Sequence, residues 1–252
     1  MNNCISINNL DKVFSSKDSG SVHVFEDLNL LFPMGKITSS LGPSGCGKTT
    51  LLNLLAGLAK PTRGTIVFPE SCQLSVGYMM QEDLLLPWRT LKENAQLGAE
   101  VTKNKSTLQG KELKKNFTDF DLAKTMNNYP DAASGGMKQR TALIRTLFYS
   151  PKILLLDEPF SNLDFETKLK IQEYLLKYQF EKKATIILVT HDIQDAVALS
   201  DKVIILSKRP TRVKKIIDIK LSIHKRNFAT AYKSNDFKKY FLEIWNEIST
   251  KL

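Results

Sequence analysis

The sequence predicts an α/β fold with a mostly parallel central sheet. Three short apolar segments, at residues 152–156, 185–189 and 202–206, have the length and composition of buried strands. Longer segments of helical composition separate them. A repeat of strand, helix and strand favours parallel strands side by side, with helices covering both faces of the sheet.

The size and composition of the chain are typical of a soluble globular protein. Its 252 residues approach the upper limit for one hydrophobic core, so we expect one large domain or a domain with a sub-lobe. No apolar run reaches the ~18 to 20 residues that cross a bilayer. The N-terminus also lacks the basic and apolar segments of a secretory signal, so we expect the protein in the cytoplasm.

The positive charge of the chain is concentrated at its C-terminal end. The net charge is +10, and residues 201–252 contain 13 Lys and Arg against 5 Asp and Glu. Such a segment can bind nucleic acid, anionic lipid or an acidic partner, or can be a solvated basic surface. No run of five basic residues occurs, so we expect no nucleic-acid partner.

The first third of the chain is predicted to consist of strands and turns. Apolar and polar residues alternate over residues 4–13, a polar loop follows at 15–21, and apolar character returns at 24–32. A short strand at 36–41 runs into a glycine-rich turn. Good helix formers then predict a helix at 49–58.

The middle of the chain changes from strand to helical character. A turn at 61–64 precedes a strand near 65–68. Thr90 and Glu93 have the spacing of a capping box at a helix start. Residues 92–128 are polar, helical in composition and rich in Lys and Asn, which indicates an inserted helical lobe.

Two further helices are predicted in the second half. One begins after Ser134 and runs to about Tyr149, where Pro151 ends it. The last segment is an amphipathic helix with Ser234 or Asn235 as its cap. Its apolar face consists of Phe237, Tyr240, Phe241, Ile244, Trp245 and Ile248. We expect this face to pack on its own domain, with docking to a membrane or partner as the alternatives.

A complete phosphate-binding motif lies between a predicted strand and a predicted helix. The sequence from Gly42 to Thr49 matches G-x-x-x-x-G-K-[ST] at every position. Its glycines let backbone N–H groups point at phosphates, and the helix N-terminus adds positive partial charge. Lys48 can reach the β and γ phosphates, and the Thr49 hydroxyl can bind Mg²⁺. We therefore expect ATP and Mg²⁺ as cofactors, with the nucleotide held by Gly42, Pro43, Ser44, Gly45, Cys46, Gly47, Lys48, Thr49 and Thr50.

One residue of this loop, Cys46, is also a candidate reactive thiol. The other cysteines are Cys4 and Cys72, and the irregular spacing of the three predicts neither a disulfide framework nor a zinc site. Loop N–H groups and Lys48 would stabilise a thiolate at Cys46, which predicts unusual reactivity. The alternative is a small side chain that merely fills space.

Two acidic residues follow a buried apolar strand. The sequence Ile-Leu-Leu-Leu at 153–156 continues into Asp157 and Glu158, at the carboxyl end of a strand where open α/β sheets bind ligands. Asp157 can hold Mg²⁺, and Glu158 can orient and deprotonate the attacking water. A strand followed by a solvated turn is the alternative.

The sequence Ala133-Ser-Gly-Gly-Met-Lys-Gln-Arg140 resembles the LSGGQ-type motif of ABC ATPases. Ser134 and the N–H groups of Gly135 and Gly136 would form an anion site at a helix start. In that family this site faces the γ-phosphate held by the other subunit, so the resemblance implies a homodimer with ATP between its copies. Ala133 stands where the family has leucine, which removes an apolar anchor but no phosphate ligand.

Four more residues resemble functional positions of the same family. Gln81 resembles the glutamine that contacts Mg²⁺ or water and reports to the membrane partner. Asp164 ends a Ser-Asn-Leu-Asp loop like the one that crosses between the two sites, and His191 resembles the histidine at the γ-phosphate. Phe14 is a candidate for stacking on adenine, although a core phenylalanine is the alternative.

The resemblance covers about residues 4–210 and implies a P-loop NTPase. It implies a core with an N-terminal antiparallel β subdomain from residues 1–80 and 152–210, and a helical subdomain at about 82–150. Residues 211–252 form a C-terminal extension. All of 1–252 would then be one ABC ATPase domain.

The segments QEDLLLPW, SGGMKQR and THDIQDAVALSDKVIILSKRP resemble ATPase subunits of importers. Their solutes include nitrate, sulfonates, taurine and thiamine precursors. The resemblance therefore implies a transmembrane permease, a solute-binding protein and a place at the cytoplasmic face of the membrane.

Three other classes of protein share parts of this pattern. An ABC-type ATPase acting on DNA would carry a long coiled coil between the P-loop and Ser134, and one acting on ribosomes would carry two cassettes. A metabolite kinase would need neither the Ser-Gly-Gly motif nor His191. A non-hydrolysing regulatory module would not need Lys48, Asp157 and Glu158 together.

Overall fold

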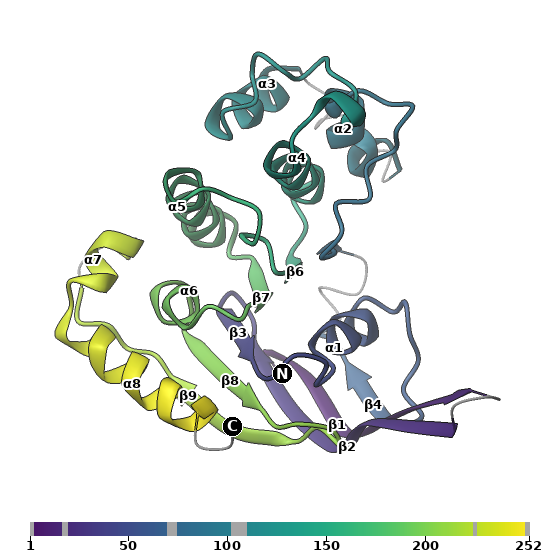
Figure 1. Ribbon diagram of the computed structural model, residues 1–252, viewed down its shortest axis with the longest axis vertical. Coiled ribbons are helices and arrows are strands. Elements are labelled where there is room, and N and C mark those ends of the chain that lie inside the picture. Colours follow the sequence, from purple (N-terminus) through teal and green to yellow (C-terminus); the bar gives the residue numbers. More distant parts are fainter. Residues whose placement is uncertain (1–2, 17–19, 70–74, 102–109, 224–225, 250–252) are drawn as a thin grey trace.

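The computed structural model describes residues 3–16, 20–69, 75–101, 110–223 and 226–249. Helices α2 and α3 lie at one end of its long axis, and the strands β1, β2 and β4 lie at the other (Figure 1). The described elements are β1 (Cys4–Ser16), β2 (Gly20–Pro33), β3 (Ile37–Leu41), α1 (Lys48–Leu55), β4 (Arg63–Val67), β5 (Val76–Met79), α2 (Leu91–Val101), α3 (Gly110–Asp119), the 3₁₀ helix η2 (Pro130–Ala132), α4 (Gly135–Phe148), β6 (Ile153–Asp157), α5 (Phe165–Lys182), β7 (Thr185–Val189), α6 (Ile193–Leu199), β8 (Lys202–Leu206), β9 (Val213–Asp218), α7 (Phe228–Tyr232) and α8 (Asn235–Ser249).

The central sheet has six strands in the order β5-β6-β7-β3-β8-β9, and the first five run parallel. Strands β3, β6 and β7 are buried along their whole length, as strands covered on both faces must be. The three predicted apolar strands are β6, β7 and β8, so the predicted α/β fold with a mostly parallel sheet is confirmed.

Strand β9 was not predicted from the sequence. It pairs antiparallel with β8 at the edge of the sheet. Its sequence, VKKIID, carries two lysines, and lysine is a residue that keeps an edge strand from pairing with other chains. Because its pairing with β8 is what defines this strand, the local sequence carried only a weak signal for it.

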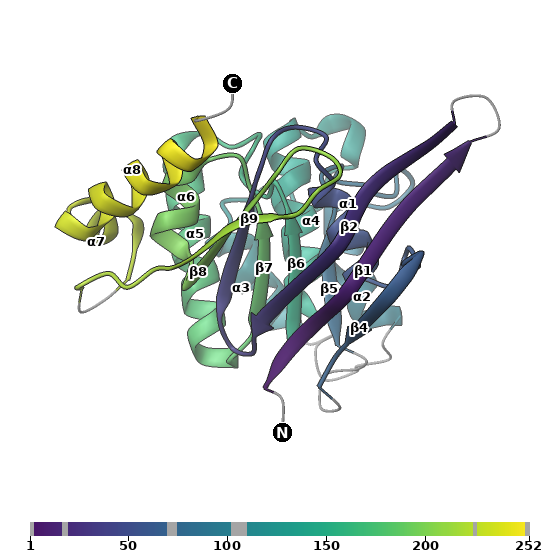
Figure 2. The ribbon, with the colours of Figure 1, turned by 90° about the horizontal axis from the view of Figure 1, so that it is seen from below.

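A second sheet, β2-β1-β4, is antiparallel, as the family resemblance implied. The predicted polar loop at 15–21 is wrong at both ends, since Ser15 pairs with Ser21 and Ser16 with Gly20. Backbone hydrogen bonding along the hairpin extends both strands into this polar sequence. The centre of that loop, 17–19, lies outside the described residues. In Figure 2 the long hairpin projects beyond the central sheet.

Helix α2 begins at Leu91, directly after Thr90, as the predicted capping box of Thr90 and Glu93 indicated. Thr90 N donates to Glu93 Oε2 at 2.8 Å, and Glu93 N donates to Thr90 Oγ1 at 3.2 Å, directly before α2. Helix α1 ends three residues earlier than expected, because Gly57 takes a φ of 74° after its last turn. Residues 102–109 of the predicted helical lobe lie outside the described residues.

The C-terminal helix packs on its own domain. Phe237 and Ile244 of α8 are buried in a cluster with residues of α6, β8 and β9. Ser234 caps the helix by accepting a hydrogen bond from Phe237 N at 3.2 Å. Trp245 is an exception, with 53% of its surface exposed. Within the described ranges, no helix is both long and apolar enough to cross a membrane.

Candidate nucleotide-binding site

The phosphate loop joins β3 to α1 at the carboxyl end of the parallel strands. Gly45 and Gly47 have φ values of 72° and 113°, which favour glycine. A Cβ atom at Gly47 would lie 2.5 Å from Val24 Cγ1, so no other residue fits there. Among the side chains that the structure describes, none caps the start of α1. The first N–H groups of this helix therefore remain available to an anion.

A cavity of about 600 Å³ lies beside this helix start. All predicted loop residues line it except Pro43 and Cys46. The other lining residues are Gln81, Asp157, Glu158, Ser161, Val189, His191 and Arg209. The structure thus brings the predicted phosphate loop, metal ligands and catalytic residues to one place. Arg209 was not predicted.

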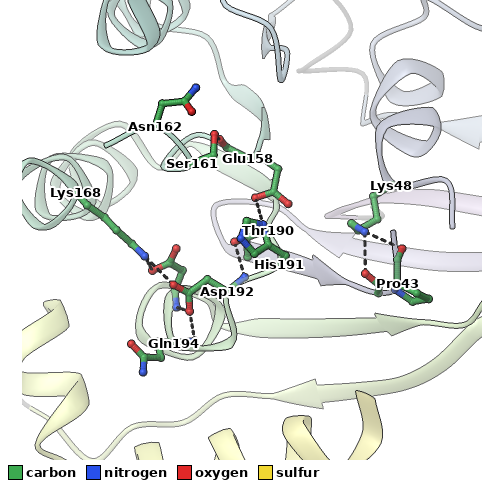
Figure 3. Close-up of polar contacts among 12 residues, drawn as sticks. Pro43, Lys48, Glu158, Ser161, Asn162, Lys168, Thr190, His191, Asp192 and Gln194 are labelled. Atoms are coloured by element: carbon green, nitrogen blue, oxygen red, sulfur yellow. Dashed lines mark hydrogen bonds and ion pairs between the residues drawn. The ribbon is translucent and has the colours of Figure 1, made fainter. Parts of the chain in front are cut away.

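The Lys48 side chain curls back over its own loop. Its Nζ donates to Gly42 O at 2.8 Å and to Pro43 O at 3.1 Å (Figure 3). These carbonyl oxygens hold the ammonium group at the edge of the cavity. Both bonds are to neutral acceptors, so a phosphate oxygen can compete for the same cation.

Thr49 and Asp157 converge from α1 and β6. Thr49 Oγ1 donates to Asp157 Oδ2 at 2.7 Å. Burial raises the pKa of the Asp157 carboxyl, and the Thr49 bond offsets part of this rise. With Gln81 in the same cavity, the donors are a hydroxyl, a carboxylate and an amide oxygen. Mg²⁺ prefers such oxygen ligands together with water and phosphate, so these residues fit that ion.

Glu158 is held in a strained backbone conformation at the end of β6. Its φ is 50°, which is unfavourable for a residue with a side chain. Glu158 N donates to Val189 O at 3.0 Å, which fixes this conformation. Its Oε2 lies 2.8 Å from His191 Nδ1, and Figure 3 shows the two side chains pointing at one another. The carboxylate therefore lines the cavity as a proton acceptor next to an imidazole.

Gln139 supports this catalytic loop, and no role was predicted for it from the sequence. It is buried on α4, where Nε2 donates to Glu158 O at 3.0 Å. Its Oε1 accepts from Asn162 N at 3.0 Å. The amide thus links the Ser-Gly-Gly helix to the loop after β6. The signal available in the sequence was a glutamine on a helix face otherwise made of glycine, threonine and apolar residues.

The family comparison agrees with this geometry. Residues 25–161 match the family model described as ABC transporter. This chain belongs to the ABC transporter family. It is therefore an ABC-type ATPase that binds ATP, and the predicted P-loop NTPase fold is confirmed.

Several known ABC proteins resemble this ATPase over most of its length. The uncharacterized ABC transporter ATP-binding protein YtlC of Bacillus subtilis is 37% identical over 89% of this chain and 88% of its own. The aliphatic sulfonates import ATP-binding protein SsuB of Bacillus cereus is 39% identical over 86% of each chain. The dimeric post-hydrolysis structure of the ATP-binding cassette MJ0796, bound to ADP and Pi, aligns with a TM-score of 0.75 and 29% identity, over 86% of this chain and 99% of that one.

The Ser-Gly-Gly motif of this ABC ATPase lies outside the cavity of its own chain. Ser134 caps α4 by accepting from Met137 N at 3.3 Å, which places Gly135 and Gly136 in the first turn. None of the three lines the cavity. A Cβ atom at Gly135 would meet no atom within 4 Å beyond its own helix start, so Gly135 faces open space, whereas a Cβ atom at Gly136 would lie 3.0 Å from Asn162 O.

Two other predicted nucleotide contacts also lie away from the cavity. Asp164 caps α5 by accepting from Thr167 N at 3.0 Å, and this bond lowers the pKa of its carboxyl. Phe14 is 47% exposed and carries Lys12 Nζ at 4.5 Å from its ring centre, so it is not a core phenylalanine. Contact of Asp164 or Phe14 with nucleotide stays a prediction.

An ion-pair cluster fixes the segment that follows His191. Lys168 Nζ on α5 lies 2.8 Å from Asp192 Oδ2 (Figure 3) and 2.7 Å from Asp195 Oδ1. Asp192 caps α6, and Asp195 also accepts from Gln172 Nε2 at 2.8 Å. Burial raises the pKa of Asp195 to about 6. Lys168 therefore ties α5 to the first turn of α6.

Lys168→Met should destabilise the fold, because it leaves the buried Asp195 without its cation. Removing one partner of a buried pair costs about 3 kcal/mol or more. Urea unfolding measures this loss. The matched control is Lys170→Met on the same helix, where the exposed pairs with Asp121 and Glu166 contribute under ~1 kcal/mol. Equal losses in both variants would contradict a structural role for Lys168.

The structure argues against the predicted reactivity of Cys46. Cys46 is only 2% exposed and packs in the apolar cluster beneath α1. Burial raises the pKa of its thiol, and the positive charge of Lys48 offsets only part of this rise. Desolvation thus outweighs the local charge that the sequence pattern emphasised.

Maleimide should therefore label Cys46 more slowly than Cys4, which is partly exposed. Time-resolved labelling with peptide mass spectrometry gives a rate for each thiol. Full unfolding in urea is the control, since it should bring the rates close together. Faster labelling of Cys46 than of Cys4 in the folded protein would instead show that Cys46 is an unusually reactive thiol.

Proposed function

We propose that this chain is the ATP-hydrolysing subunit of an importer for a small solute, and that it works as a homodimer on a separate membrane permease. The observation that carries the proposal is the cavity that joins the Lys48 loop, the Thr49–Asp157 pair and the Glu158–His191 pair. Membership of the ABC family supports it, and so does the dimeric MJ0796 relative.

The chemistry assigns a separate task to each residue of the cavity. Lys48 and the loop N–H groups bind the β and γ phosphates, and Glu158 accepts the proton of the attacking water. His191 and Lys48 stabilise negative charge on the transferring phosphoryl group. Mg²⁺, bound by Thr49, Asp157 and Gln81, would neutralise further phosphate charge.

The second copy would complete each site. We propose that Ser134, Gly135 and Gly136 of one molecule contact the γ-phosphate held by the loop of the other, and that Asp164 lies between the two sites. The open space around Gly135 supports this assignment, because an exposed helix start can bind an anion held by a second molecule.

The proposal extends to the membrane. Residues 82–150 would form a helical subdomain that passes motion from Gln81 to a permease helix, with the remaining core binding nucleotide. The ATPase would lie at the cytoplasmic face of the membrane. The name of the Bacillus cereus relative favours sulfonates, with nitrate, taurine and thiamine precursors as the other solutes to compare.

Reconstitution tests this function. The chain, a candidate permease and a matching binding protein are placed in vesicles, and ATP hydrolysis and solute uptake are measured together. Both should rise with one of the four solutes and be absent in a Lys48→Ala variant. Stimulation by DNA or ribosomes, or phosphate transfer to a metabolite, would instead support the other classes.

A further inference from the structure

Arg209 places a second cation at the phosphate cavity. It lines the same cavity as Lys48. Its terminal guanidinium nitrogen lies 3.2 Å from the position that a Cβ atom of Gly45 would occupy. The guanidinium therefore lies directly over the backbone of the phosphate loop, although Arg209 follows that loop by more than a hundred residues in the sequence.

The turn that carries Arg209 is anchored to the phosphate loop. Thr211 is fully buried, and its hydroxyl donates to Cys46 O. Thr211 N donates to Val24 O at 2.8 Å. Across the turn, Ser207 N donates to Arg212 O at 3.0 Å. These bonds hold the start of the Arg209 side chain in a fixed position beside the cavity.

Among the residues that the structure describes, Arg209 forms no ion pair with a carboxylate. Two other arginines of the C-terminal region do form one, since Arg212 pairs with Glu26 at 2.8 Å and Arg226 pairs with Asp201 at 3.3 Å. An arginine that lies against the N–H groups of an anion-binding loop is repelled by their positive partial charge. An anion bound in the loop would reverse this repulsion.

We propose that Arg209 donates hydrogen bonds to the terminal phosphates of bound ATP, as a second cation beside Lys48. This inference rests on the proposed nucleotide site. A guanidinium suits the role, because its planar donors can engage two phosphate oxygens at once. The cavity that Arg209 lines also contains Glu158 and His191, and it does not contain Phe14, the candidate adenine contact. The phosphate end of the nucleotide therefore fits Arg209 better than the base.

The test compares Arg209→Ala with Lys208→Ala. Lys208 is the neighbouring exposed cation of the same turn, and it does not line the cavity. The affinities of ATP, ADP and AMP are measured by competition with a fluorescent nucleotide, at protein concentrations that keep the chain monomeric. Arg209→Ala should lower the affinity for ATP about 10- to 100-fold, the range expected when a hydrogen bond to a charged group is lost. The same variant should lower the affinity for ADP less and leave the affinity for AMP unchanged. Lys208→Ala should bind all three nucleotides with wild-type affinity.

Arg209→Lys keeps the charge but loses the planar fork, so it should recover part of the ATP affinity. Unchanged ATP affinity in Arg209→Ala would overturn the proposal, and so would an equal loss for ATP and AMP. A defect seen only in dimer formation would overturn it as well, since Arg209 would then contact the second copy. Lys48→Ala separates the two claims: if that variant binds ATP normally, the proposed nucleotide site itself fails.

Discussion

Glu158→Gln should abolish ATP turnover while leaving ATP binding intact. The amide has the size of the carboxylate but cannot accept a proton from water. The substitution changes the side-chain contact with His191 but leaves the backbone bonds to Val189 and from Gln139, so the loop should keep its shape. We expect the rate of phosphate release to fall at least ~100-fold, the contribution of a positioned general base. The closed dimer should accumulate with ATP, which size-exclusion chromatography detects.

Glu166→Gln is the matched control for this experiment. Glu166 is an 81% exposed carboxylate in the first turn of α5, and it lies outside the cavity. The control should hydrolyse ATP at the wild-type rate. Substantial steady-state hydrolysis by Glu158→Gln would show that another group accepts the proton. Glu158 would then not be the catalytic base.

The elements that were predicted correctly are those that neighbouring residues determine. Strands β6, β7 and β8 are short runs of apolar residues, and the phosphate loop is a continuous motif. The capping box of α2 spans only Thr90 to Glu93. In each case the physical cause lies within a few residues, so the sequence carries the whole signal.

The features that were missed depend on contacts between distant segments. Strand β9 exists because β8 offers it an edge, and Gln139 acts on a loop about twenty residues further along the chain. Arg209 reaches the phosphate loop from a turn that Thr211 anchors to Cys46 O and Val24 O. Cys46 also depends on distant residues. The charges next to it in the sequence predicted a reactive thiolate, but burial by other segments raises the pKa of its thiol.

Mixing two inactive variants should restore ATPase activity. The proposed dimer places the Lys48 loop of one copy opposite the Gly135 helix tip of the other, and a two-fold axis repeats this contact. Lys48→Ala disables the first element. Gly135→Phe disables the second, and the open space around Gly135 allows the monomer to fold with this side chain. Each variant alone should hydrolyse ATP at least ~100-fold more slowly than the wild type.

A mixed dimer has one intact site, formed by the loop of the Gly135→Phe chain and the helix tip of the Lys48→Ala chain. With random pairing, half of the dimers are mixed, so about a quarter of the wild-type activity should return if the sites act independently. Mixing Lys48→Ala with Glu158→Gln is the control. Lys48 and Glu158 line the same cavity of one chain, so neither site of that mixed dimer is complete and no activity should return. If the first mixture also stays inactive, the loop and the helix tip do not act on one nucleotide from different molecules.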